Sequence, residues 1–327
     1  MPTKNLEKKT QQFITELTAA GGPPLYTLTP VEARKVLDNL QSKPVEKPAV
    51  LIEDLKILSG KKEVSVRIVR PAESSGVLPI IMYFHGGGWI LGNKDTHDRL
   101  IRELACGSHA AVVFVNFTPA PEAQYPTQIE EAYAATHYIA ENAHSMNLDA
   151  GRLAVAGDSV GGNMAAVITL LAKERNGPKI HFQALFYPVT DANFNTPSYR
   201  EFADGPWLTK PAMEWFWNAY APNHADRKKP TVSPLQASLD QLRNLPPALI
   251  ITDENDVLRD EGEAYAHKLI QAGVEVTVMR YIGTHHDFLL LNALSDTPAA
   301  RSAMALATST LQKAFQLQRT ARKRKAA

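Results

Sequence analysis

One serine on a glycine-flanked bend constrains this chain more than any other feature. Leu153–Ala156 is a short apolar run, and Gly157-Asp158-Ser159-Val160-Gly161 follows it directly. Apolar residues then recur with the i, i+3, i+4, i+7 spacing of a buried helix face, at Met164, Val167, Ile168 and Leu171. Because a Gly-x-Ser-x-Gly bend between a strand and a helix lifts the serine hydroxyl clear of the sheet, we interpret Ser159 as a nucleophile rather than a structural turn.

Strand-like and helix-like segments alternate along most of the chain. This pattern predicts an α/β fold with a mostly parallel sheet and helices on both faces. The predicted strands are 51–58, 64–69, 78–84, 111–117, 152–156, 180–187, 247–252 and 274–281. The predicted helices include 6–20, 95–108, 128–143, 160–175, 259–272 and 298–317, and a capping box at Thr29-Pro30-Val31-Glu32 begins one more. The first two strands look half-exposed, so we expect them to be antiparallel at an edge of the sheet.

Two segments interrupt this alternation, namely the N-terminal helices within residues 1–47 and a proline-rich insert at 192–232. The insert contains an aromatic-dense helix at Met213–Tyr220, which is typical of an apolar pocket wall as well as of plain packing. We therefore expect one domain of 327 residues with a helical cap over the serine and a flexible basic tail at 318–327. The candidate substrate-binding residues are Trp89, Trp207, Leu208, Trp215, Phe216 and Phe288, although each fits a simple core position equally well.

Composition excludes several classes of partner. The net charge of +1 offers no electrostatic reason to bind nucleic acid, and a single cysteine, Cys106, excludes an intrachain disulfide. Neither a membrane-spanning apolar stretch nor a signal peptide is evident, so we expect a cytoplasmic protein without a membrane span. We expect a small-molecule substrate and no cofactor, and a homodimer is compatible with the sequence.

A nucleophilic serine needs a histidine to take its proton and an acid to orient that imidazole. Of ten histidines, only His285 and His286 directly follow a late predicted strand. A metal site at His285-His286-Asp287 is disfavoured because adjacent side chains point in different directions. The strand 247–252 ends in three carboxylates, and any of Asp253, Glu254 and Asp256 has the right place to be the acid.

The sequence His85-Gly86-Gly87-Gly88-Trp89 follows a fully apolar strand and is a candidate oxyanion loop. Consecutive glycines let the backbone turn its N–H groups toward the charge that develops on a carbonyl oxygen. The N–H group of Val160, at the start of the helix after Ser159, is placed to add another donor.

Four motifs together resemble the hormone-sensitive-lipase family (family IV) of α/β-hydrolases, in its bacterial carboxylesterase branch with a Gly-Asp-Ser-Ala-Gly-Gly motif. They are His85–Trp89, Gly157–Asn163, Asp256–Gly262 and His286–Phe288. The resemblance implies Ser159 as nucleophile, Asp256 as acid and His286 as base. It also implies Gly87, Gly88 and Val160 as oxyanion donors, with Gly86 shaping the loop, and a cap built from the two interrupting segments.

The chain departs from that family pattern in three places. Val160 stands where alanine is usual and is expected to narrow the acyl pocket, Val257 replaces a proline, and Asp287 replaces a glycine. The added carboxylate of Asp287 either raises the basicity of the histidine or faces solvent. The resemblance predicts a serine carboxylesterase for short- to medium-chain acyl esters. The alternatives are a non-catalytic ligand-binding protein on the same fold and an amidase or deacetylase with the same triad.

Overall fold

The computed structural model describes residues 5–59 and 62–326. Within this part of the chain eight strands form one sheet in the order β1-β2-β4-β3-β5-β6-β7-β8. The strands are β1 (Val50–Ser59), β2 (Lys62–Pro71), β3 (Leu78–Phe84), β4 (Ala111–Asn116), β5 (Leu148–Asp158), β6 (Phe182–Phe186), β7 (Ala248–Asn255) and β8 (Val276–His285). Strand β2 pairs antiparallel with β1 and β4, whereas the other neighbours are parallel. This confirms the predicted α/β-hydrolase sheet and its antiparallel edge.

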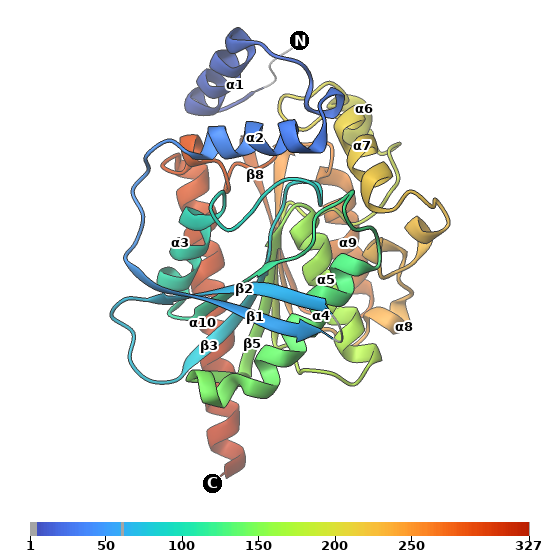
Figure 1. Ribbon diagram of the computed structural model, residues 1–327. Coiled ribbons are helices and arrows are strands. Elements are labelled where there is room, and N and C mark those ends of the chain that lie inside the picture. Colours follow the sequence, from blue (N-terminus) through green and yellow to red (C-terminus); the bar gives the residue numbers. More distant parts are fainter. Residues whose placement is uncertain (1–4, 60–61, 327) are drawn as a thin grey trace.

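Helices cover both faces of the sheet. The α-helices are α1 (Lys8–Ala20), α2 (Pro30–Gln41), α3 (Asp98–Ser108), α4 (Thr127–Asn142), α5 (Val160–Glu174), α6 (Pro197–Glu201), α7 (Lys210–Tyr220), α8 (Leu239–Leu242), α9 (Arg259–Gln271) and α10 (Pro298–Ala326). The 3₁₀ turns are η1 (Leu25–Thr27), η2 (Ala143–Met146), η3 (Asp226–Lys228), η4 (Pro234–Gln236) and η5 (Asn292–Leu294). Helices α3 and α10 lie on one face, and α4, α5 and α9 lie on the other (Figure 1). Each face therefore has its own apolar core, and the central strands are buried on both sides.

The helices of the two interrupting segments gather at one end of the molecule. Figure 1 shows α1 and α2 at the top, with α6 and α7 beside them. The turn η1 packs on α7, which joins the N-terminal segment to the insert. Helix α2 has the predicted capping box, in which Thr29 accepts the N–H of Glu32 while the Glu32 carboxylate accepts the N–H of Thr29. That these helices form a cap over Ser159 stays a prediction, and residues 1–4 lie outside the described part of the chain.

Several predicted boundaries were wrong. Helix α3 begins at Asp98 rather than Asp95, because the Asn93 side chain accepts the N–H groups of Asp95 and Thr96 and holds a turn there. Strand β5 includes residues 149–151, which were predicted as a turn, because a bulge lets Leu148 and Asp149 pair with β3.

The other corrections concern the C-terminal third of the chain. Strand β8 extends to His285, because its pairing with β7 continues to Asn255. Helix α10 continues from Leu317 to Ala326, and no glycine or proline interrupts that stretch. The flexibility predicted for residues 318–327 is not tested, because most side chains of that tail lie outside the described residues. Among the described helices, none is at once long and apolar enough to span a membrane.

Candidate active site

Ser159 lies on a strained bend between β5 and α5. Its backbone has φ 54° and ψ −120°, a conformation that residues other than glycine seldom adopt. The Ser159 N–H donates to the carbonyl of Phe186 at 2.8 Å, and its own carbonyl accepts the N–H of Val189 at 3.1 Å. The bend is therefore held by the loop after β6, and the serine side chain is directed past the end of the sheet.

The glycines around Ser159 are required by close backbone contacts. A Cβ atom on Gly157 would lie 2.3 Å from the carbonyl oxygen of Gly161. A Cβ atom on Gly161 would lie 2.0 Å from the carbonyl oxygen of Phe84, at the end of β3. Both distances are far below van der Waals contact, so a larger residue would displace the bend from the neighbouring strand.

Ser159, His286 and Asp256 form one chain of hydrogen bonds. The Ser159 Oγ atom lies 2.9 Å from His286 Nε2, and His286 Nδ1 lies 2.7 Å from Asp256 Oδ2. All three residues are buried, with Ser159 only 4% exposed. This is the geometry in which an imidazole accepts the serine proton while a carboxylate fixes its tautomer.

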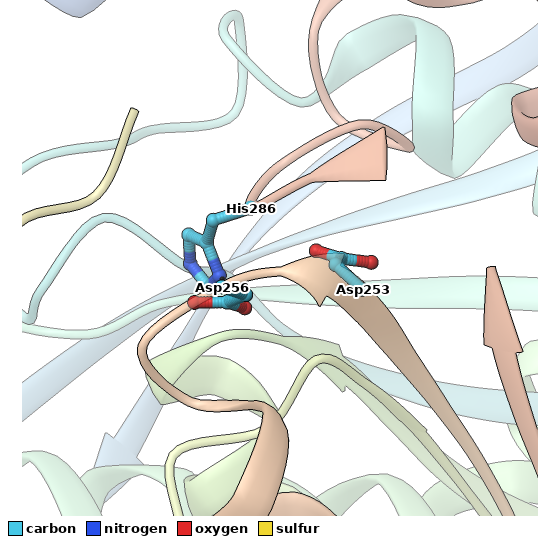
Figure 2. A group of neighbouring side chains, drawn as sticks. All are labelled: Asp253, Asp256 and His286. Carbon is cyan, nitrogen blue, oxygen red and sulfur yellow. Dashed lines mark hydrogen bonds and ion pairs between the residues drawn. The ribbon is translucent and has the colours of Figure 1, made fainter. Parts of the chain in front are cut away.

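The register of the sheet brings the acid and the base together. Asn255 at the end of β7 pairs with His285 at the end of β8, so the next residues, Asp256 and His286, leave the sheet side by side. Figure 2 shows the His286 ring beside the Asp256 carboxylate, with Asp253 nearby on β7. The edge of the sheet at which the parallel strands end thus collects side chains that are distant in sequence.

Two carboxylates act on His286. Burial by itself lowers the pKa of His286, but the negative charges of Asp256 and Asp287 outweigh burial and raise the pKa to about 9. Asp287 Oδ1 lies 3.6 Å from His286 Nε2, and Asp287 Oδ2 accepts the indole N–H of Trp207 at 2.9 Å. The Asp287 carboxylate was expected either to raise the basicity of the histidine or to face solvent. It lies beside His286, and its side chain is only 14% exposed.

The other candidates for base and acid have different surroundings. His285 is buried in one cluster with the rings of Phe13 and Trp207, and burial lowers its pKa to about 4. Glu254 accepts the N–H of Gly283 at 2.8 Å and so helps to hold β8. Asp253 is buried close to Asp256 and His286 but has no hydrogen bond to either.

A buried carboxylate that sequence reasoning missed joins the candidate oxyanion loop to the serine bend. Asp158 Oδ1 accepts the N–H of Gly86 at 3.0 Å and the hydroxyl of Tyr83 at 2.6 Å, and Asp158 Oδ2 lies 3.3 Å from His97 Nε2. Burial raises the pKa of Asp158, but His97 and Tyr83 outweigh burial and lower the pKa below its usual value. The only signal in the sequence was the position of Asp158 next to Ser159.

Two glycines in the loop after β3 have positive φ angles. Gly87 and Gly88 have φ 101° and 64°, and the carbonyl of Gly87 accepts the N–H of Leu91 at 2.7 Å. Gly86 uses its N–H on Asp158, in agreement with a role in shaping the loop. The amides of Gly87, Gly88 and Val160 remain predicted donors.

The predicted substrate-binding residues come from the loop after β3, from the segment between β6 and β7 and from the turn after β8. Trp89 is fully buried and stacks on Tyr220 of α7 at 4.0 Å, which is a packing contact. Phe216 of α7 covers Gly88, since a Cβ on that glycine would lie 2.0 Å from its ring. The remaining candidates are Trp207, Leu208 and Trp215, which are half-buried, and Phe288, which is buried against Tyr187. The Tyr187 ring, not singled out from sequence, also contacts the His286 ring at 4.9 Å.

Known proteins resemble this chain over most of its length. Residues 81–290 match the sequence model of a protein family whose description is 'alpha/beta hydrolase fold'. Carboxylesterase NlhH of Mycobacterium tuberculosis is 39% identical over 86% of this chain and 89% of its own. The crystal structure of a thermostable esterase from Pseudomonas putida ECU1011 has a TM-score of 0.94 and 50% identity, covering 95% of this chain and 98% of that one. An ethyl acetate hydrolase of Pseudomonas putida is 38% identical over 70% of this chain and 72% of its own.

The fold, the hydrogen-bonded Ser-His-Asp group and the esterases that the chain resembles together define an enzyme of the serine hydrolase class. The chain belongs to the α/β-hydrolase-fold family, in the branch that resembles hormone-sensitive lipase and includes carboxylesterases. The predicted serine esterase is thereby confirmed in preference to a non-catalytic binding protein.

Proposed function

We propose that Ser159 is the nucleophile, His286 the general base and Asp256 the acid of a carboxylesterase. The observation that carries this assignment is the unbroken line of hydrogen bonds from Ser159 Oγ through both nitrogens of His286 to Asp256. His286 takes the serine proton as Oγ attacks the ester carbonyl, then gives it to the leaving alcohol. Water, deprotonated by the same imidazole, releases the acid from the acyl-enzyme.

The backbone amides of Gly87, Gly88 and Val160 are our proposed oxyanion donors. Each such donor lowers the barrier by about 3 kcal/mol when it points at the developing charge. Support comes from the left-handed backbone of Gly87 and Gly88 and from the place of Val160 at the first turn of α5.

Replacement of the serine tests the assignment. We expect Ser159→Ala to lose about three or more orders of magnitude in kcat/KM for p-nitrophenyl butyrate, because no other group can form the acyl-enzyme. Ser302→Ala, an exposed serine on α10, is the matched control and should keep full activity. Near-normal turnover by Ser159→Ala would overturn the assignment.

We further propose that the substrates are esters with short to medium acyl chains. In the cap, proposed as residues 1–47 and 192–232, the ring of Phe216 lies against Gly88 of the proposed oxyanion loop. A relative named as an ethyl acetate hydrolase agrees with a small acyl group. A series of p-nitrophenyl esters from acetate to palmitate tests this, and maximal kcat/KM at twelve carbons or more would refute it. A homodimer and a cytoplasmic location stay predictions, and light scattering after size exclusion would test the first.

A further inference from the structure

Asp253 is a buried acid for which the fold alone provides no reason. Its side chain is fully buried on β7, and neither carboxyl oxygen has a hydrogen-bond partner among the described residues. A buried carboxyl group without a partner destabilises a fold by about 1–3 kcal/mol when neutral and by more when charged. An apolar residue of the same size would avoid this penalty, so the acid calls for an explanation.

Asp253 lies beside the two residues of the active site that hold and move the proton. One polar atom from each of Asp253, Asp256 and His286 lies within 4.8 Å of the other two. In Figure 2 the Asp253 carboxyl stands at the end of β7, on the same strand end from which the Asp256 loop departs. Contact between Asp253 and His286 would therefore require the Asp253 side chain to turn toward the imidazole over a distance of a few ångström.

The surroundings of Asp253 favour the neutral form of its carboxyl group. Burial, followed by the negative charges of Asp256 and Asp287, raises the pKa of Asp253 well above its usual value. The hydroxyl of Tyr187 also interacts electrostatically with the Asp253 carboxyl group, and the imidazole of His286 is a nearby group that can carry a positive charge. Removal of the Asp256 charge takes away one of the two carboxylates that oppose ionisation of Asp253.

We propose that Asp253 is a second acid of this active site, a positioning residue that orients His286 when the Asp256–His286 hydrogen bond is lost. In that event Asp253 releases its proton to solvent, and its carboxylate accepts the Nδ1–H of His286. The role rests on the proposed function, since it presumes that His286 is the base and Asp256 its normal partner. Triads are defined by geometry rather than by the position of the acid in the sequence.

A set of four variants tests this role. We choose Asp256→Ala because alanine, unlike asparagine, has no N–H that would fix the wrong imidazole tautomer. Loss of a sole acid lowers kcat by about four orders of magnitude in a serine protease. We expect kcat of Asp256→Ala to fall by only about two orders of magnitude, and kcat of Asp253→Asn alone to fall by less than about threefold. In the double variant kcat should be at least a further tenfold lower than in Asp256→Ala.

The matched control is Asp191→Asn in the Asp256→Ala background. Asp191 is also a buried carboxylate, but it accepts hydrogen bonds from Ala192 and Gln236 away from the triad. This control should cause no additional loss. The pH profile gives a second readout, because kcat/KM of Asp256→Ala should rise through an additional ionisation that the double variant lacks.

The outcomes separate the two proposals. If the double variant matches Asp256→Ala in rate and pH profile, Asp253 has no such role, while the triad assignment stands. If Asp256→Ala keeps wild-type activity, Asp256 is not the acid and the proposed function fails in that respect. A tenfold or larger additional loss specific to Asp253, with fluorophosphonate labelling of Ser159 slowed in parallel, supports the second acid.

Discussion

The carboxylate of Asp158 accepts the backbone N–H of Gly86 at 3.0 Å, so the residue before Ser159 holds the first glycine of the loop that we propose binds the oxyanion. The fit between the two is close, since a Cβ atom on Gly86 would lie 2.3 Å from Asp158 Oδ2. Nucleophile and oxyanion loop are therefore positioned by one buried side chain. Movement of the loop by as little as an ångström would misdirect its amides.

Neutralising this carboxylate should slow catalysis more than it weakens substrate binding. Asparagine keeps the shape of Asp158 but loses the charge that strengthens its hydrogen bonds to Gly86 and Tyr83. We expect Asp158→Asn to lower kcat by about tenfold or more with KM changed less than threefold, since oxyanion contacts strengthen in the transition state. Steady-state kinetics with p-nitrophenyl acetate measure the effects on kcat and KM separately. A rise in KM at constant kcat would show that Asp158 does not act through the oxyanion loop.

Removing the charge of Asp287 should shift the acidic limb of the pH profile. His286 must be unprotonated in the free enzyme to act as base, and Asp287 helps to raise its pKa against the effect of burial. Asp287→Asn lowers that pKa, so we expect the limb of kcat/KM to move to lower pH by about half to one unit.

The control for Asp287→Asn is Trp207→Phe. This change removes the hydrogen bond from the indole N–H to Asp287, which helps to lower the pKa of Asp287, but it keeps an ionisable carboxyl group beside His286. The acidic limb of Trp207→Phe should therefore move less than that of Asp287→Asn. An unshifted limb in Asp287→Asn would mean that the carboxylate does not influence the base.

Gly88 should tolerate no side chain, for a reason specific to the cap. An alanine Cβ at this position would lie 2.0 Å from the ring of Phe216 on α7, and the backbone has φ 64°. We expect Gly88→Ala to lower kcat/KM by about two orders of magnitude, comparable to loss of one oxyanion donor.

Gly76 offers a matched control for backbone strain. Its φ is 81°, but a Cβ there would meet nothing within 4 Å. Gly76→Ala should cause only a modest fall in melting temperature and leave kcat/KM unchanged. Equal kinetics for Gly88→Ala and wild type would show that the loop does not need its present shape.

The fold and the central hydrogen-bonded group were predictable because their signals are local. Ser159, Asp256 and His286 each follow the end of a strand, and parallel strands bring such ends to one edge of the sheet. The glycines on either side of Ser159 also indicated, from the sequence alone, that the backbone is closely packed at this bend.

The partners of Asp158 and Asp287 could not be predicted, because they come from distant segments. His97 falls within the predicted helix 95–108, and the structure buries it fully with its Nε2 atom 3.3 Å from Asp158 Oδ2, 61 positions further along the chain. Asp287 meets Trp207 only because the insert folds back over the end of β8. Such contacts depend on how the cap docks, which no short-range pattern of residues encodes.

Val160 is the residue of the serine bend at which substrate range should be altered most directly. Its predicted catalytic contribution is a backbone N–H, so a change of side chain leaves that donor in place, while its buried isopropyl group lies next to the nucleophile. We expect Val160→Ala to keep acetate turnover within about threefold and to raise kcat/KM for octanoate relative to acetate by about tenfold, because the substitution removes two carbon atoms and a single methylene already changes pocket discrimination by about 1–3 kcal/mol.

Val167→Ala provides the comparison for the loss of core packing. Val167 is equally buried on the same helix, so both variants should lose about 1–3 kcal/mol of unfolding free energy. Only Val160→Ala should change the ratio of octanoate to acetate turnover, since Val160 follows the proposed nucleophile directly and is the side chain predicted to narrow the acyl pocket. If both variants leave the ratio at the wild-type value, then Val160 does not limit the acyl pocket, and the limit on chain length must arise from the cap helices instead.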